Sequence, residues 1–187
     1  MPFYLIIERT AILNLLSPTL LVASVVITAI LFAIVAFFSR AGLHRILGVL
    51  LAAIPLIPMI MFYDKIAAQF GWWYYPSVTA SRAPLAWYIA AGLGYGAGFG
   101  LVGWRLIRRW KTCGFLTFLL LFALFGMARD FGYSVTTRVI IFGPGLVPLL
   151  ADLFAYGSGA AVVQLLMRLI VGPAQSDALV RTSKVRT

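Results

Sequence analysis

The feature that most constrains this chain is a series of long apolar runs separated by short polar segments. The first run covers residues 18–38 and contains no charged side chain. Its 21 residues match the roughly 20 that an α-helix needs to cross about 30 Å of hydrocarbon. Because 63% of the 187 residues are hydrophobic and only 11% are charged, a soluble fold of this size could not bury its apolar surface. The sequence therefore predicts an all-α, polytopic transmembrane helical bundle and excludes a soluble enzyme, a disordered chain and a disulfide-rich scaffold.

Four further runs extend this pattern to about five spans. They cover residues 46–63, 84–104, 114–128 and the stretch from the turn at 143–145 to Val171. Pro55 and Pro58 predict a bend in the second span, since proline removes backbone hydrogen bonds. Residues 1–16 are apolar but carry Glu8 and Arg9, which indicates an interfacial helix. We expect one transmembrane domain over residues 1–172 and a basic, mobile cytoplasmic tail over residues 173–187.

The basic residues predict how the bundle is oriented. Of the 15 Lys and Arg residues, ten fall in residues 39–45, 105–113 and the C-terminal end from Arg168, and five fall on the other side. Lys and Arg concentrate in cytoplasmic loops, so we expect the N-terminus outside and the C-terminus inside a cell membrane. The net charge of +10 then reflects topology and contact with anionic lipid, and no nucleic-acid partner is expected.

Glycines form a regular stripe in the third span. Gly92, Gly96 and Gly100 are spaced by four residues, a spacing that lets helix backbones approach closely within membranes. Gly157 and Gly159 in the fifth span offer a counterpart. Three interpretations stay open: packing within the chain, association as a homo-oligomer or within a larger membrane complex, and a flat cofactor lying against the glycines.

The loop between the second and third spans is rich in aromatic residues that carry polar atoms. Such side chains favour the headgroup level of a bilayer, which indicates an aromatic belt. The alternative is the lip of a groove that binds a lipid or another ligand. The residues of this candidate groove, from the loop and from the fourth and fifth spans, are Trp72, Trp73, Tyr74, Tyr75, Arg82, Arg129, Arg138 and Tyr156.

Acidic residues gather on the same predicted outer side. Asp152 lies about five residues inside the fifth span, where an ionisable side chain is costly and normally faces the bundle interior with a partner. Arg129 and Arg138 are the expected partners. Structural pairing alone explains this arrangement, but Asp64, Asp130 and Asp152 are also candidate catalytic residues, with Asp64 or Asp152 giving or taking a proton.

Several chemistries lack their sequence signatures. There is no G-x-x-x-x-G-K-[ST] phosphate loop, no H-E-x-x-H zinc motif and no G-x-S-x-G nucleophile elbow. The single Cys113 and the single His44 make neither an intrachain disulfide nor a structural zinc site. No metal and no cofactor is therefore predicted.

One segment resembles a known family. Asp64-x-x-Ala67-x-x-x-Gly71-Trp72 follows a predicted transmembrane helix and resembles a segment of the small membrane lycopene cyclases of carotenoid synthesis. In those proteins a Pro-x-Glu-Glu-type motif follows, which the resemblance would make catalytic. Here the nearby stretch is Pro84-Leu85-Ala86-Trp87, which has neither glutamate, so no catalytic residue is carried over.

Together these features predict a lipid-interacting protein or accessory membrane subunit whose partners are membrane lipids. The alternative is a membrane enzyme that modifies isoprenoids, carotenoids or lipids with its outer carboxylates. A small transporter ranks last because no inverted repeat is found.

Overall fold

The computed structural model describes residues 18–76, 85–136 and 138–176, and these residues are all-α apart from one pair of two-residue strands. Three helical stretches are long and apolar enough to cross a membrane: Leu43–Phe70, Leu85–Thr136 and Val147–Val171. The expected interfacial helix over residues 1–16, Arg82 and most of the expected tail lie outside the described residues. In chain order the elements are α2 (Pro18–Ser39), α3 (Leu43–Ala53), α4 (Leu56–Phe70), β1 (Trp73–Tyr74), α5 (Leu85–Ile89), a π-helix (Ala90–Gly96), α6 (Ala97–Thr136), β2 (Ile141–Phe142), α7 (Val147–Val171) and a 3-10 turn (Ala174–Ser176).

The second expected span is a broken helix. Helix α3 ends at Ala53 and α4 begins at Leu56, because Pro55 has no N–H with which to continue the α-helical hydrogen bonds. The N–H of Ile57 bonds to the carbonyl of Ile54 at 3.1 Å and closes the turn between them. The prolines thus interrupt the helical hydrogen bonds, while Ile54 and Pro55 stay in the right-handed helical region.

The chain reverses within the expected loop over residues 105–113, but the turn is confined to Lys111 and the other residues of that stretch are helical. Within α6 only Lys111 leaves the helical region, with φ 52° and ψ −126°. The stretch of residues 105–110 contains no Gly or Pro, so its helix propensity persists beyond the apolar run. At Lys111 the chain doubles back, and the ring of Phe99 packs against Phe122 and Phe125 at centroid distances of 4.8 and 5.2 Å.

The glycines of the stripe pack against other helices of the same chain. A Cβ atom at Gly92 would lie 2.8 Å from the Ile57 side chain of α4, and one at Gly100 would press on Val49 of α3. The glycine stripe was expected to pack against α7, but it packs mainly against the broken helix α3–α4. Gly159 of α7 joins the same contact, since a Cβ there would lie 3.4 Å from Leu56, whereas a Cβ at Gly157 would meet Ala123 of α6 at 3.8 Å. These contacts leave the glycines covered by the chain itself.

Gly114 lies where the two arms of α6 come closest. A Cβ atom there would overlap the backbone carbonyl of Leu106, which cannot move aside as a side chain could. We expect Gly114→Ala to lower the free energy of unfolding by about 1–3 kcal/mol, measured as a lower apparent melting temperature in mild detergent. Gly132→Ala in the same helix is the control, since a Cβ there meets nothing within 4 Å. Equal melting temperatures for the two variants would contradict this packing.

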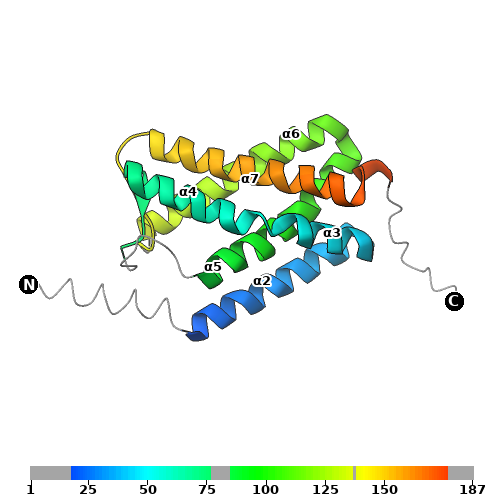
Figure 1. The fold of residues 1–187 in the computed structure, drawn as a ribbon, viewed down its shortest axis with the longest axis horizontal. Helices are drawn as coiled ribbons and strands as arrows, with labels where there is room; N and C mark the ends of the chain where they lie inside the picture. The colour runs from blue at the N-terminus through cyan, green and yellow to red at the C-terminus, as the bar shows by residue number, and fades with distance from the viewer. Residues whose placement is uncertain (1–17, 77–84, 137, 177–187) are drawn as a thin grey trace, which may run out of the picture.

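The helices lie along the long axis of the molecule and bring distant segments together at two ends (Figure 1). One end, called the strand end, holds β1 and β2, which pair antiparallel with Trp73 opposite Phe142. The other, called the basic end, holds the start of α3, the bend in α6 and the end of α7, and with them Arg45, Lys111 and Arg168. Between the ends lies a core of fully buried side chains from α3, α6 and α7: Val49, Leu101, Trp104, Val163 and Met167.

Candidate functional site

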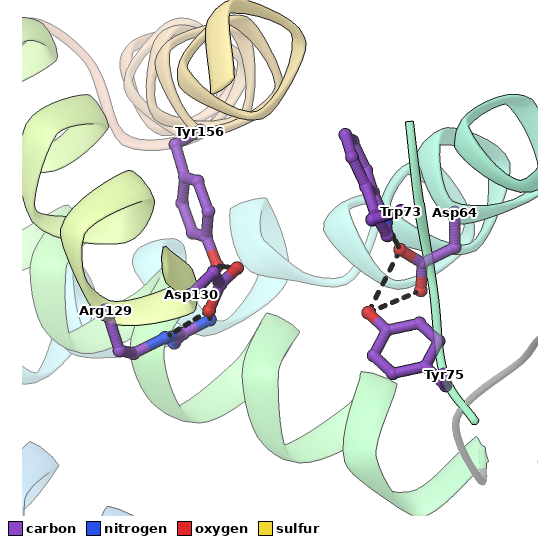
Figure 2. Close-up of polar contacts among 6 residues, drawn as sticks. All are labelled: Asp64, Trp73, Tyr75, Arg129, Asp130 and Tyr156. Carbon is purple, nitrogen blue, oxygen red and sulfur yellow. Dashed lines mark hydrogen bonds and ion pairs between the residues drawn. The ribbon is translucent and has the colours of Figure 1, made fainter. Parts of the chain in front are cut away.

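At the strand end, Asp64 is the centre of a buried hydrogen-bond network. Its carboxyl group is only 4% exposed and accepts a bond from the indole Nε1 of Trp73 at 2.9 Å and one from the hydroxyl of Tyr88 at 2.7 Å. The hydroxyl of Tyr75 donates to it at 3.2 Å, and Figure 2 shows Trp73 and Tyr75 converging on the carboxyl from the segment after α4. Three donors from two segments, the chain after α4 and helix α5, fix this carboxyl in one orientation.

A left-handed glycine places these donors. Gly71 ends α4 with φ 67°, a conformation that glycine adopts without steric penalty. The N–H of Trp72 then bonds to the Ala67 carbonyl at 2.8 Å, and the chain turns back along the helix. Because side chains alternate along the following strand, Trp73 and Tyr75 face Asp64.

The aromatic side chains that follow α4 therefore have two different environments. Trp73 and Tyr75 serve Asp64, whereas Tyr74 is 45% exposed and Trp72 stacks on Phe70 at 5.2 Å. Burial and the nearby Asp64 charge raise the pKa of Tyr75 well above its ordinary value, so this hydroxyl keeps its proton and remains a donor.

A second polar cluster, formed by Arg129, Asp130 and Tyr156, faces the first (Figure 2). Arg129 pairs with Asp130, with Nη2 2.7 Å from Oδ1, and the Tyr156 hydroxyl donates to Oδ2 of Asp130 at 2.7 Å. Arg129 also donates to the Tyr156 hydroxyl. Its guanidinium lies between the rings of Tyr95 and Tyr156, at 5.3 and 5.4 Å from their centroids. Such stacking on aromatic faces stabilises a poorly hydrated cation.

Asp152 is placed differently from the other two carboxylates. It is 3% exposed, and its Oδ2 has no hydrogen-bond partner among the residues that the structure describes. Arg129, one of its expected partners, forms its ion pair with Asp130. Arg138, the other, lies in an exposed turn after α6 with φ 53° and does not line the cavity that contains Asp152.

All three aspartates line one cavity of about 120 Å³ among α4, the π-helix, α6 and α7. We call it the carboxylate cavity. Its other walls are largely apolar and include Leu56, Met59, Ile60 and Phe122. This volume holds a few water molecules or a short hydrocarbon segment of a ligand. The π-helix contributes Tyr95 and Gly96 to the wall, and π-helical turns occur frequently at functional sites.

The charge balance limits what this cavity can bind. Three carboxyl groups face a single guanidinium, which is already paired with Asp130. The described lining therefore offers an additional anion no second cation, while it offers several carboxyl oxygens as hydrogen-bond acceptors. The cavity is therefore suited to a hydrogen-bond donor or a cation. Within the described ranges there is no cluster of His, Cys, Asp and Glu side chains suited to a metal ion.

The structure brings together only part of the candidate set. Asp64, Asp130, Asp152, Trp73, Arg129 and Tyr156 line the carboxylate cavity, whereas Trp72, Tyr74 and Arg138 do not. Sequence reasoning missed Tyr88 and Tyr95, although a tyrosine inside an apolar run needs a polar partner and is itself a signal. Comparisons with protein-family models, with curated proteins and with solved structures find no match for this chain.

Proposed function

We propose that this chain is a multi-pass protein of the cell membrane that binds a lipid or isoprenoid in the carboxylate cavity. The proposal includes five crossings, with the strand end outside and the basic end inside. Two features support this orientation: the three described aspartates line a cavity at the strand end, and Arg45, Lys111 and Arg168 line a pocket at the opposite end. Positive residues favour the cytoplasmic side.

One observation carries the proposed binding: the buried Oδ2 of Asp152 has no partner in the described part of the chain. A buried acceptor without a donor costs free energy, and a bound molecule that donates a hydrogen bond would remove that cost. The apolar walls of the cavity require the rest of the molecule to be lipid-soluble. An amphiphile with a hydroxyl or amine group satisfies both conditions.

Removing the acceptor tests this proposal. The protein is purified in mild detergent, and the lipids that remain bound are extracted and measured by mass spectrometry. We expect one species at near-stoichiometric amount in the wild type and about a tenfold loss in Asp152→Leu, since a tenfold change in affinity is about 1.4 kcal/mol, the contribution of roughly one hydrogen bond. Leu150→Ala is the control, because Leu150 is on the same helix and 62% exposed. Equal amounts of lipid in all three proteins would contradict the proposal.

A second candidate function is a membrane enzyme that modifies an isoprenoid or lipid. The same unpartnered oxygen favours it, because a carboxyl group that is not committed to a protein donor is available to give a proton to a bound molecule or take one from it. The ordered Asp64 and the Arg129–Asp130 pair would then hold that molecule in place. Asp152→Asn should abolish turnover while the lipid stays bound, measured by comparing lipid extracts of cells that express each form. Unchanged products in Asp152→Asn and in Asp64→Asn would exclude this function.

A further inference from the structure

A second and larger pocket lies at the basic end, far along the bundle from the carboxylate cavity. Its volume is about 400 Å³, within the range of cavities that hold small molecules. The wall is formed by α3, both arms of α6, α7 and the segment that follows α7. Pockets built from several elements around a fixed floor are typical ligand sites.

Cations from three elements meet in this pocket. Lys111 at the bend of α6 and Arg168 near the end of α7 are both exposed and line its rim, together with the hydroxyl-bearing Thr112. Arg45 of α3 lines it as a buried side chain. No acidic side chain lies among the described residues of the lining. The pocket at the basic end is thus lined by cations and hydrogen-bond donors, whereas the carboxylate cavity is lined by three carboxyl groups.

The backbone around the pocket is held in place by side chains. Arg45 donates to the carbonyl of Gly172 at 3.1 Å and to that of Pro173 at 3.4 Å, and Arg108 donates to the carbonyl of Ala174 at 3.0 Å. These bonds draw the segment after α7 across the bend of α6. Lys111 and Arg168 line the same pocket as this bound segment.

The floor of the pocket contains a second orphaned polar atom. Trp104 is fully buried and lines the pocket, and its indole Nε1 has no acceptor among the described residues. The neighbouring wall is apolar and continues to the surface through Leu165, which is 58% exposed. The pocket thus joins hydrogen-bond donors and positive charge to an apolar flank that opens toward the lipid-facing surface.

We infer that this pocket at the basic end binds a phosphate group, held by Lys111 and Arg168. Phosphate is an anion with several acceptor oxygens, and Arg and Lys side chains are its usual ligands in proteins. A phospholipid headgroup and a soluble phosphate ester share this chemistry. The site is separate from the carboxylate cavity and does not depend on the function proposed for that cavity.

The test uses the full chain in phosphatidylcholine nanodiscs, with two probes. In one arm phosphatidylglycerol is added to the bilayer, and in the other glycerol 3-phosphate is added to the solution. Binding is read as retained ligand in native mass spectrometry and as a rise in apparent melting temperature. A response to phosphatidylglycerol alone identifies a headgroup site, and a response to glycerol 3-phosphate identifies a site open to soluble esters; either supports the inference.

Matched variants separate a built site from general attraction by basic residues. The Lys111→Gln/Arg168→Gln protein should lose binding about tenfold, as expected when charge-assisted hydrogen bonds are removed. Arg105→Gln/Arg109→Gln removes the same number of charges from the same end but outside the pocket lining, and should change binding by less than about twofold. Equal losses in the two proteins, or no response to either probe in the wild type, would overturn the inference.

Discussion

Asp64→Leu is expected to destabilise the protein strongly. The side chains of Trp73, Tyr75 and Tyr88 all donate to this carboxyl, so leucine would leave three buried donors without an acceptor. Each such group costs about 1–3 kcal/mol, and we expect a loss of about 3–5 kcal/mol in the free energy of unfolding, seen as a large drop in apparent melting temperature in mild detergent.

Two variants provide the comparison for Asp64→Leu. Asp64→Asn keeps one acceptor oxygen and should be destabilised clearly less. Lys65→Ala changes the next residue, which is exposed, and should leave the melting temperature nearly unchanged. If Asp64→Leu melted together with Lys65→Ala, the hydrogen-bond network around Asp64 would not stabilise the strand end.

Arg129→Met is the second change with a large expected effect. Arg129 is the ion-pair partner of Asp130 and lies against the rings of Tyr95 and Tyr156. Removing it leaves the carboxylate of Asp130 without its cation inside the bundle. Breaking one side of a fully buried ion pair costs about 3–5 kcal/mol. The Arg129 and Asp130 side chains are 24% and 14% exposed, so we expect a loss of about 1–3 kcal/mol, seen as a lower apparent melting temperature in mild detergent.

A double variant separates the lost pair from a general packing defect. In Arg129→Met/Asp130→Asn no unpaired charge remains, so the protein should regain part of the stability lost in Arg129→Met. If the two changes instead lowered stability additively, Arg129 and Asp130 would not be coupled and the described ion pair would carry little energy.

The sequence predicted the all-α class and the end of the first helix, but not the break between α3 and α4 or the π-helix. The length of the first apolar run predicted where the first helix ends. The expected span ended at Phe38, and α2 ends at Ser39. Asp64, Asp130 and Asp152 line one cavity, because helices begin or end at the same end of the molecule (Figure 1). The length of an apolar run and the position of a charged residue within it can both be read from the local sequence. This is why the end of the first helix and the side of the acidic residues could be predicted.

The partners of the charged side chains could not be predicted from the sequence in the same way. Asp152 was expected to bind Arg129, but the ion pair forms between Arg129 and its chain neighbour Asp130. Helix rotation decides which of two nearby carboxylates a guanidinium reaches, and a periodic pattern does not specify that rotation. The chain reversal was expected within residues 105–113 and occurs there, at Lys111. Its exact position could not be predicted, since it depends on how the arms of α6 pack through Phe99 and Gly114.

The orientation of the two ends across a membrane is the claim on which the proposed function rests most directly. Cys113 is exposed at the bend of α6, and Tyr74 at the strand end is 45% exposed. A membrane-impermeant maleimide would be applied to cells that express either the wild type or the Tyr74→Cys/Cys113→Ala protein. We predict labelling of the introduced cysteine in intact cells and of Cys113 only after permeabilisation. Labelling of both positions from the same side, or the reverse order, would contradict the account.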